Sequence, residues 1–397
     1  MGMEITLIIN PGSSSKKFAL YQGRTRLLDA YVERNENGFE MCTAISGIQQ
    51  KCELLDKQGF KESLHDFLAL AQKLNHITDP TDVTRVVMRV VAPGTFFQTH
   101  REINNEYSSR LQAVTALAPL HIPHLIHEIE AIKKFLPNVK IIAASDSAFH
   151  STIKDFVRRY SLPENESKKY DIYRFGYHGL SIASVIKKAA RLTLKEASRT
   201  IVCHIGSGVS VTAVRDGRSV DTTMGYSPGS GLIMGSRAGD LDAGALLALM
   251  QAKNLKPTDA QLYLQTNGGL FGLTGEADLR QLLARRAQGD QVATDAISSF
   301  VYHIQKAIGA YVAILGGVDA VIFTATASER NSVLRSLIVE NLSGLGISMV
   351  TEKNEACLSR DGILSADDSP VVVMVIKTDE ANEMLSIGET FSPLVER

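Results

Sequence analysis

Charged and hydroxyl side chains stand at points of the chain where apolar residues or plain turns are expected. The run Asn10–Lys17 (NPGSSSKK) places three hydroxyls and two ammonium groups at the end of a predicted strand. Arg89 interrupts the apolar stretch Val86–Val91, where an unpaired guanidinium would be costly. Asp146 follows the apolar strand predicted over Val139–Ala143, at the strand end where α/β sites form. The hydroxyl, ammonium and guanidinium groups among them can bind phosphate or carboxylate.

Two further segments combine a cation with glycine. Arg174–Gly179 (RFGYHG) holds His178 between glycines, and Gly229–Asp242 (GSGLIMGSRAGDLD) places Arg237 in a loop too glycine-rich to be core. The chain contains no Gly-Lys dipeptide, which excludes a P-loop of the G-x-x-x-x-G-K-[ST] type. Any phosphate site is therefore of another kind.

Each of these residues also has an ordinary structural explanation. Lys16 or Lys17 could be a solvated turn cation, and Arg89 could pair with a structural carboxylate. Asp146 could cap the following helix. His178 could be a hydrogen-bonded core histidine, as isolated histidines usually are.

The acidic residues near Arg237 leave similar alternatives. Arg237 could form a surface ion pair with Asp240 or Asp242, which alternate with Leu241. The same two carboxylates could resemble metal ligands, but a helix N-cap role is favoured because no further ligand spacing supports a metal.

An internal repeat indicates two similar domains. Thr6–Arg24 (TLIINPGSSSKKFALYQGR) matches Thr200–Arg218 (TIVCHIGSGVSVTAVRDGR), each predicted as strand, small-residue turn and strand. Small turn residues let backbone N–H groups approach phosphate oxygens. The two turns could form a phosphate clamp, or the hairpins could be alike by chance.

Strands alternate with helices along both halves, which predicts an α/β fold with a mainly parallel sheet. Pro163–Asp171 (PENESKKYD) is predicted as an exposed loop, and Val292–Leu315 as a central, largely buried helix. The predicted strands are Ile5–Ile9, Phe18–Gln22, Arg26–Val32, Val83–Val91, Val139–Ala143, Thr200–His204, Gly208–Arg215, Arg218–Thr223, Val318–Thr324 and Val371–Ile376. The other predicted helices are Glu62–Leu74, His124–Phe135, Ala243–Lys253, Glu329–Leu345 and Glu380–Ile387.

Composition narrows the class of protein. The chain has 397 residues, 42 basic and 43 acidic side chains and a net charge of −1, so no cationic field favours nucleic acid or an anionic membrane. Its apolar runs are strand-sized, below a membrane span. The four cysteines show no CxxC pair or metal-ligand spacing, which indicates a reducing, cytoplasmic location.

Taken together, the motifs resemble those of the acetate/propionate kinase family over nearly the whole chain, from Ile8 to about Glu380. The matching blocks, in the same order, are INPGSSSKK, RVVAPG, APLHIP, SDSAFH, RFGYHGLS, CHIGSG, DTTMGYSP and GLIMGSRAGDLD. The resemblance implies two ribonuclease H-like domains of the acetokinase, sugar kinase, chaperone and actin superfamily around a cleft. Residues 1–147 with about 378–397 would form one domain, and 148–377 the other, with the nucleotide and dimer surfaces.

The resemblance also implies an activity and its site residues. Family members transfer phosphate reversibly from Mg-ATP to acetate or another short-chain carboxylate, with Mn²⁺ able to replace Mg²⁺, and form homodimers. The implied catalytic residues are Arg89, Asp146, His178 and Arg237, and the implied metal ligands are Asn10 and Glu380. The implied substrate-binding residues are Arg89, Val91, Leu120, His121, Tyr177 and Pro228. The implied nucleotide-binding residues are Ser13, Ser15, Lys17, His204, Gly206, Ser207, Gly208, Asp278, Leu279, Arg280, Thr326, Ala327 and Ser328.

Some motifs depart from the family pattern. The family's His-Arg-Val-Val-His-Gly-Gly reads Met88–Gly94 (MRVVAPG), and Ser207 replaces an asparagine. The family's Ala-Gly-Ile-Gly-Glu-Asn loop reads Ala325–Arg330 (ATASER), where added Cβ atoms narrow the space for adenosine. The donor could thus be ATP, GTP or pyrophosphate, whereas Val91 favours acetate over propionate.

The sequence therefore predicts a small-carboxylate kinase. One alternative is a catalytically weak relative that binds nucleotide or acyl phosphate as a regulator. Another is a sugar kinase or actin-like ATPase, which would share the hairpins but not the set of Arg89, Asp146, His178 and Arg237.

Overall fold

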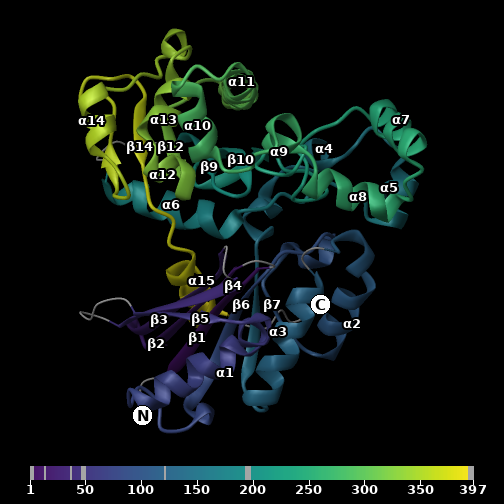
Figure 1. Cartoon of the computed structure of the whole chain (residues 1–397), viewed down its shortest axis with the longest axis vertical. Coiled ribbons are helices and arrows are strands. Elements are labelled where there is room, and N and C mark those ends of the chain that lie inside the picture. Colours follow the sequence, from purple (N-terminus) through teal and green to yellow (C-terminus); the bar gives the residue numbers. More distant parts are fainter. Residues whose placement is uncertain are drawn as a thin grey trace. The chain divides into compact units, whose positions relative to one another are not determined.

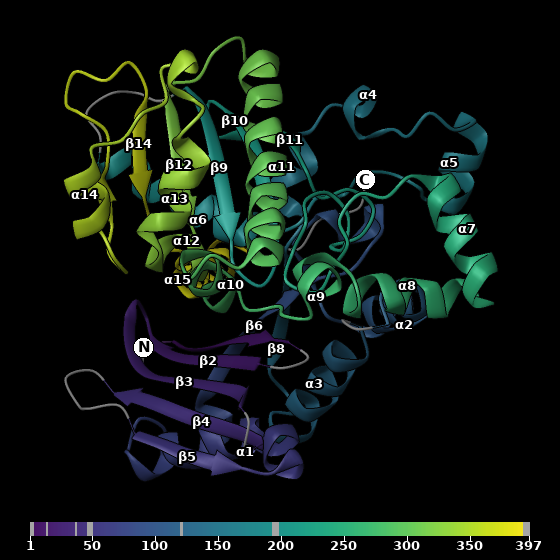
Figure 2. The same cartoon turned by 45° about the horizontal axis from the view of Figure 1, so that its top comes forward.

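The computed structural model describes residues 4–12, 15–35, 38–45, 51–119, 122–192 and 198–391. The chain divides into two compact units (Figures 1 and 2). Unit 1 comprises Met1–Ala148 and Glu380–Arg397, and unit 2 comprises Phe149–Asp379. Each unit has its own sheet, and each is described by itself.

Unit 1 is built on an eight-stranded sheet in the order β5-β4-β3-β2-β1-β6-β8-β7. Its strands are β1 (Ile5–Pro11), β2 (Ser15–Gln22), β3 (Thr25–Asn35), β4 (Gly38–Ile45), β5 (Lys51–Leu55), β6 (Val83–Val90), β7 (Arg101–Glu102) and β8 (Lys140–Ser145). Within the described strands, only the β1–β6 and β6–β8 pairs are parallel, because consecutive strands from β1 to β5 are close in sequence and pair antiparallel. The predicted mainly parallel sheet is therefore wrong, and the sheet is mixed.

Helices cover both faces of this sheet (Figure 1). α1 (Lys57–Lys73) and α3 (Ile122–Phe135) bury apolar residues at helical spacing against Phe18, Leu20 and their neighbours. α15 (Glu380–Thr390) lies against the opposite face, where a Cβ on Gly388 would approach Val87. Alternation along β1, β2 and β6 therefore sends Asn10, Lys17 and Arg89 to the face opposite α1 and α3.

Unit 2 repeats the scheme in a six-stranded sheet of order β11-β10-β9-β12-β14-β13. Its strands are β9 (Arg199–Ile205), β10 (Val209–Arg215), β11 (Arg218–Thr222), β12 (Ala320–Thr324), β13 (Gly362–Ile363) and β14 (Val372–Val375). As in unit 1, an antiparallel hairpin is followed by two parallel neighbours. The order β3-β2-β1-β6-β8 thus matches β11-β10-β9-β12-β14, which explains the sequence repeat structurally.

α6 (Gly179–Leu192) packs its apolar face on Val202, Val214 and Ile322 of the second sheet. α11 (Gln291–Leu315) was predicted to be largely buried, but only one face is, since Tyr302 and Ile314 are exposed. The remaining helices are α2 (Asn105–Ala113), α4 (Asp155–Arg158), α5 (Glu164–Tyr170), α7 (Ala243–Lys253), α8 (Pro257–Thr266), α9 (Gly269–Thr274), α10 (Leu279–Ala287), α12 (Thr326–Arg330), α13 (Ser332–Val339) and α14 (Thr351–Ala356).

Two local predictions are wrong. The segment predicted as an exposed loop, Pro163–Asp171, contains helix α5, which ends where Asp171 takes a left-handed backbone conformation. The single helix predicted over Glu329–Leu345 is broken, because Asn331 is extended and its side chain accepts a hydrogen bond from Leu334 N that begins α13.

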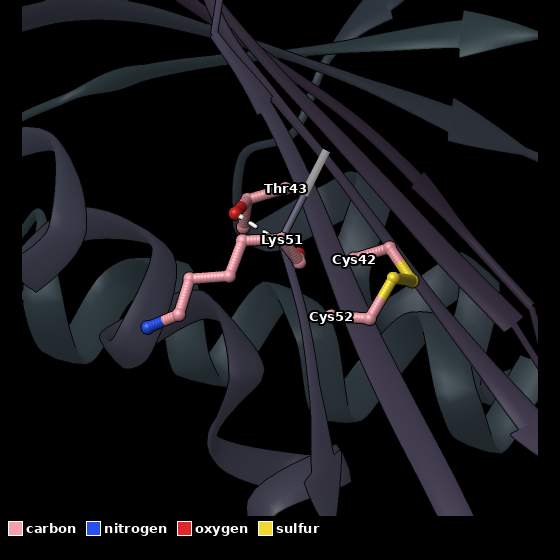
Figure 3. Close-up of a disulfide and its surroundings, with 4 residues drawn as sticks. All are labelled: Cys42, Thr43, Lys51 and Cys52. Atoms are coloured by element: carbon pink, nitrogen blue, oxygen red, sulfur yellow. Dashed lines mark hydrogen bonds between the residues drawn. A yellow bond between two sulfur atoms is a disulfide. The ribbon is translucent and has the colours of Figure 1, made fainter. Parts of the chain in front are cut away.

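The cysteines also depart from expectation. Cys42 and Cys52 are directly opposed on β4 and β5 and form a disulfide (Figure 3). Cys203 and Cys357 are free and buried. The sequence, which shows no CxxC spacing, gave no sign of the cross-strand pair.

Among the described residues, none of the helices combines the length and the hydropathy that a bilayer span requires.

Candidate active site

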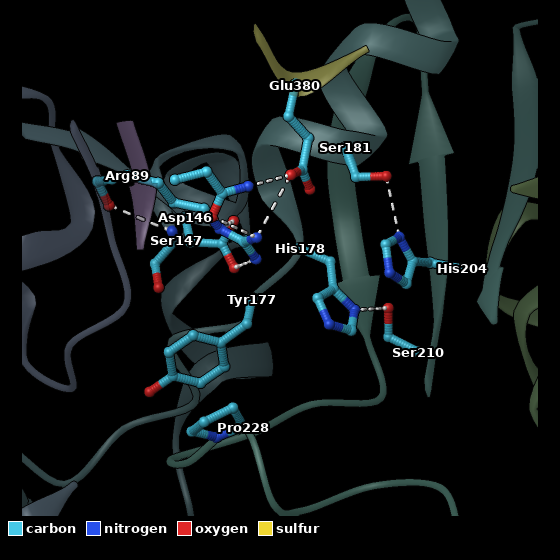
Figure 4. Close-up of polar contacts among 12 residues, drawn as sticks. Arg89, Asp146, Ser147, Tyr177, His178, Ser181, His204, Ser210, Pro228 and Glu380 are labelled. Carbon is cyan, nitrogen blue, oxygen red and sulfur yellow. Dashed lines mark hydrogen bonds and ion pairs between the residues drawn. The ribbon is translucent and has the colours of Figure 1, made fainter. Parts of the chain in front are cut away.

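Arg89 on β6 is the centre of a polar cluster in unit 1 (Figure 4). Its Nε and Nη2 each donate to one carboxylate oxygen of Asp146 at 3.0 Å, a bidentate pair. Its Nη1 lies 3.4 Å from Glu380 Oε2 and 3.4 Å from Asn10 Oδ1. Asn10 Nδ2 in turn donates to Glu380 Oε2 at 2.7 Å. Four residues that are far apart in sequence therefore meet at one place.

The strand order explains this meeting. Asp146 N donates to Val90 O immediately beyond the β6–β8 ladder, which holds Asp146 beside Arg89. Asp146 is 1% exposed, whereas Arg89 keeps 18% of its side chain accessible. Burial alone would lower the pKa of Arg89, but the charges of Asp146 and Glu380 outweigh it and raise that pKa above its ordinary value. Arg89 is thus a fixed cation whose side chain is not fully buried.

Lys16 and Lys17 point to opposite faces of β2. The Lys16 ammonium is buried 2.8 Å from Glu128 Oε2 of α3 and lies 4.9 Å from the Phe60 ring centroid. It is neither a solvated turn cation nor available to a ligand. Lys17 is exposed on the face that carries Asn10, and its Nζ lies 5.7 Å from the Tyr31 ring centroid.

Two histidines stack in unit 2. The rings of His178 and His204 have centroids 3.9 Å apart and an interplanar angle of 21°. His178 Nδ1 bonds Ser210 Oγ at 2.9 Å, and His204 Nδ1 bonds Ser181 Oγ at 2.9 Å (Figure 4). In each histidine the serine bond at Nδ1 sets the orientation of the ring, and Nε2 lies on the side of the ring away from that serine.

The backbone at His178 is strained and braced. His178 has φ +65°, a region that non-glycine residues seldom adopt. The preceding carbonyl, of Tyr177, is bonded by His150 Nε2 at 2.8 Å, and His150 Nδ1 bonds Ser219 Oγ at 2.9 Å. The buried His150 thereby helps to hold the backbone of His178 in this conformation. Strained backbone held in this way is common at functional sites.

Arg237 and His178 converge on Gly208. A Cβ added to Gly208 would lie 2.8 Å from His178 Nε2 and 3.6 Å from Arg237 Nη1. Arg237 Nη1 also donates to Pro228 O at 3.1 Å. An imidazole and a guanidinium therefore border a backbone position that lacks a side chain, an arrangement suited to an anion.

The carboxylates near Arg237 have structural tasks. Asp242 caps α7 by accepting from Ala245 N at 3.0 Å, as the sequence favoured, and Asp240 accepts from Gly231 N at 2.7 Å.

The loop after β12 is held by buried side chains. Ala325, at φ +70°, donates its N–H to Glu329 Oε1 at 2.8 Å, and the same oxygen accepts from Thr378 N at 3.1 Å. The Ser328 hydroxyl donates to Thr324 O at 2.5 Å, so it is used internally. Thr326 is exposed and Ala327 is half-buried.

The turn Gly206–Gly208 joins β9 to β10, and Ser207 at its tip is exposed. Asp278 caps α10 by accepting from Arg280 N at 2.8 Å, and its carboxylate also pairs with the exposed Arg280 guanidinium at 2.6 Å. Leu279 is the first residue of that helix.

The other predicted substrate residues are spread over both units. Val91 is half-buried after β6, Pro228 is buried, and the buried Tyr177 donates its hydroxyl to Tyr226 O at 2.7 Å. Ser15 begins β2. Ser13, Leu120 and His121 lie outside the described residues. Met88 and Ala92, where the family has histidines, are buried in the core of unit 1.

Some residues that shape the site escaped the sequence analysis as individuals. Ser181, Ser210 and His150 orient the histidines or their backbone, yet they were noticed only as letters within motifs or strands. The strand period does place Ser210 directly opposite His204, a signal that could have found it.

The comparisons with known proteins agree with this architecture. The profile of the Acetokinase family matches residues 5–386. Among curated proteins, the acetate kinase of Thermotoga maritima is 35% identical, with 98% of each chain covered.

Solved structures give the same picture. Crystal structures of Porphyromonas gingivalis acetate kinase (30% identity, TM-score 0.84) and a Francisella tularensis propionate kinase (28% identity, TM-score 0.89) match 98% of this chain. They cover 99% and 100% of those chains, respectively.

The duplicated sheets and the structural matches define a protein with the two-domain, actin-like ATPase fold. Within that fold, the chain belongs to the acetokinase family, whose members are phosphotransferases with a carboxyl group as acceptor.

Proposed function

We propose that the protein is a short-chain carboxylate kinase that transfers phosphate reversibly between Mg-ATP and acetate, giving acetyl phosphate and ADP. The observation that carries the proposal is the convergence of His178 and Arg237 on Gly208, in a chain that also fixes Arg89 by a bidentate bond to Asp146. Phosphoryl transfer to a carboxylate brings several negative charges together, so it chiefly needs fixed cations.

In the proposed reaction an acetate oxygen attacks the γ-phosphorus and forms a new P–O bond. The bond from that phosphorus to the bridging oxygen breaks, and its electron pair leaves with ADP. A carboxylate is already ionised at neutral pH, so no general base is required. The task of the protein is alignment and cancellation of charge.

Each unit would supply part of this. Arg89, whose side chain is partly accessible, would bind the acetate carboxylate, while Asp146 keeps the guanidinium in place. His178 and Arg237 stabilise the phosphoryl oxygens, with Ser210 fixing the imidazole. We propose that Val91, Tyr177 and Pro228 contact the acetate methyl.

The oxygen atoms of Asn10 and Glu380 fit a magnesium ion. They offer one amide and one carboxylate oxygen, the hard ligands that Mg²⁺ takes alongside phosphate oxygens. Both oxygens already face a cation, the Arg89 guanidinium, at 3.4 Å. The ion, when bound, would neutralise charge on the nucleotide phosphates.

The nucleotide would bind to unit 2. The turn His204–Gly208 would face the phosphates, and the loops at Asp278–Arg280 and Thr326–Ser328 would contact the nucleoside. Ser15 and Lys17 would add phosphate contacts from unit 1. Because Thr326 and Ser328 carry Cβ atoms where the family pattern has glycine, GTP and pyrophosphate belong in the same test as ATP.

The proposal is tested by trapping acyl phosphate as the hydroxamate in mixtures of acetate, Mg²⁺ and ATP, GTP or pyrophosphate. Arg237→Ala should lower turnover about 10²- to 10³-fold while leaving the melting temperature nearly unchanged. Absence of hydroxamate with all three donors would remove the kinase proposal. A large loss of stability in Arg237→Ala would mark Arg237 as structural.

We also propose a homodimer. Helix α7 (Ala243–Lys253, AGALLALMQAK) buries none of its residues within the chain, and Leu247 on it is 65% exposed. An apolar helix of this kind is typical of a subunit interface. A cytoplasmic location remains a prediction of the sequence.

A further inference from the structure

One row of residues crosses five strands of unit 1. The registers pair Asn10 with Lys17, Lys17 with Tyr31, Tyr31 with Cys42, and Cys42 with Cys52. Directly opposed residues share one face of a sheet. The row therefore leads from the proposed metal ligand, through the proposed phosphate-binding lysine, to the disulfide at the sheet edge.

This face is the one opposite α1 and α3. The neighbouring positions Phe18, Val32 and Met41 point into the core beneath those helices, so Lys17, Tyr31 and Cys42 point the other way. Lys17 is exposed and Tyr31 is half-buried. The lysine thus depends on its neighbours in the row for a defined position.

Tyr31 is the nearest such neighbour. The Lys17 ammonium lies 5.7 Å from the Tyr31 ring centroid, within the range of a cation–π contact. The Tyr31 hydroxyl also donates to Glu33 Oε2 on the same strand, so the contact with Lys17 uses the ring alone. A long lysine side chain loses much of its freedom against such a surface.

The disulfide follows Tyr31 in the cross-strand row, since Cys42 is paired with Tyr31 and Cys52 with Cys42. It joins β4 to β5, the edge strand, in which Lys51 to Glu53 and Leu54 are exposed (Figure 3). β5 pairs with β4 through a backbone ladder from Lys51 to Leu55 and has no strand on its other side, so the covalent link adds a restraint to this one ladder. Tyr31 is directly paired with Cys42, the β4 end of this link.

We infer that Tyr31 is a positioning residue for the Lys17 ammonium, and that the Cys42–Cys52 bond makes this positioning sensitive to thiol reductants. The inference rests on the proposed function only in assigning Lys17 to the donor phosphates. The contact between Lys17 and Tyr31 is independent of any activity.

The redox step is an exchange with a small dithiol. One thiolate of the dithiol attacks the Sγ of the exposed Cys52, the Cys42–Cys52 bond breaks, and Cys42 leaves as a thiolate that takes a proton from water. The second thiol of the reagent, as its thiolate, then displaces Cys52 and closes the reagent's own disulfide. Two electrons and two protons pass to the protein.

Reduction followed by alkylation should modify Cys42 and Cys52 selectively, because the other two cysteines are buried. Burial raises the pKa of the Cys203 thiol to about 12 and also raises that of Cys357. Alkylation after mild reduction therefore reports Cys42 and Cys52 alone.

The first test is spectroscopic and needs no activity. Lysines are reductively methylated with ¹³C, and the Lys17 signal is assigned with Lys17→Arg. The signal should show an upfield ring-current shift that is lost in Tyr31→Leu, kept in Tyr31→Phe, and reduced by dithiothreitol. In Cys52→Ser it should start at the reduced position and not respond to dithiothreitol.

Thr43→Ala is the matched control, since Thr43 lies next to Cys42 on β4 and points to the other face. It should keep the shift and the redox response. A Lys17 signal that is the same in the wild type and Tyr31→Leu, or that ignores reduction of the disulfide, would overturn the inference.

The second test is kinetic. Reduction, Cys52→Ser and Tyr31→Leu should each raise KM for the donor about two- to fivefold with little change in kcat, the size of an exposed cation–π contact. Tyr31→Phe should restore the wild-type KM. Unchanged KM values in an active enzyme would overturn the coupling, whereas expected NMR shifts without any acyl phosphate would refute the proposed function alone.

Discussion

Asp146 sets the position of the Arg89 guanidinium. Both carboxylate oxygens are occupied by the guanidinium, so Asp146 serves to hold a cation in a setting where burial would otherwise be unfavourable. The structural pairing suggested for Arg89 and its proposed role in binding substrate are compatible, because part of the side chain stays accessible.

We predict that Asp146→Asn lowers kcat/KM for acetate at least about 10²-fold, because the amide cannot hold the guanidinium in a charged, bidentate pair. Steady-state kinetics with acetate as the varied substrate measure this. The control is Arg110→Ala, which removes a surface ion pair with Glu106 on α2 and should leave kinetics unchanged. Equal effects of the two variants would contradict the assigned role.

The buried pair of Lys16 and Glu128 leads to a stability prediction. Lys16→Met or Glu128→Leu alone should lower the free energy of unfolding by about 3–5 kcal/mol, because each leaves an unpaired buried charge. The double variant should recover most of that loss, since two apolar side chains need no partner. Urea unfolding measures all three, and single and double variants of equal stability would show that the charges are not coupled.

For single residues, the sequence indicated which side chains need a partner, but it could not predict which residue that partner would be. It identified Arg89 as a guanidinium in need of an acid, but only the β6–β8 register shows that the acid is Asp146. It treated Lys16 and Lys17 alike, although their adjacent positions on a strand send one into the core and one to the surface. Contacts such as Lys16 with Glu128 join residues too distant in sequence for any local pattern to reveal.

The turn between β9 and β10 matters because two of its residues, Gly206 and Gly208, lack side chains. We predict that Gly208→Ala lowers kcat at least tenfold, because the new Cβ would lie 2.8 Å from His178 Nε2 and displace the ring. Gly206→Ala is the matched variant, since its Cβ would meet Ala325 Cβ at an ordinary 3.4 Å and should cost much less.

Both glycine variants are to be compared by steady-state kinetics and thermal melting. A Gly208→Ala enzyme with wild-type kcat would mean that the space beside His178 is not used in catalysis.

Strong periodic elements were predictable and weakly patterned ones were not. The boundaries of α7, β10 and β12 follow from apolar runs and flanking turn residues. α5 was missed because its sequence, ENESKKY, is polar all round and carries no apolar face. The break between α12 and α13 was missed because Asn331 acts as an internal cap within an otherwise helical pattern.

The two sheets of the whole molecule share one strand order, and the sequence repeat was sufficient to predict that duplication. The repeat could not predict the proportion of parallel pairs, since hairpin strands β2 to β5 pair through short turns while β6 and β8 return by helices. The disulfide was likewise invisible, because its cysteines meet only through the β4–β5 register.

We predict that the protein is a dimer in solution and that Leu247→Asp yields a monomer that remains folded. Leu247 contributes nothing to the core of the chain, so a charge there should affect only an interface. Light scattering after size exclusion measures the mass, and circular dichroism checks the fold. A wild-type monomer, or a Leu247→Asp dimer, would contradict the proposed interface.

The central claim is that a carboxylate oxygen attacks the phosphorus of the donor. Acetate labelled with ¹⁸O in both oxygens, incubated with ATP, Mg²⁺ and the enzyme, gives the most direct test by ³¹P NMR. We expect acetyl phosphate whose phosphorus signal carries the isotope shift of one bridging ¹⁸O, formed only when acetate and enzyme are both present. Formation of inorganic phosphate without labelled acetyl phosphate would show that acetate does not accept the phosphoryl group, and would contradict the account.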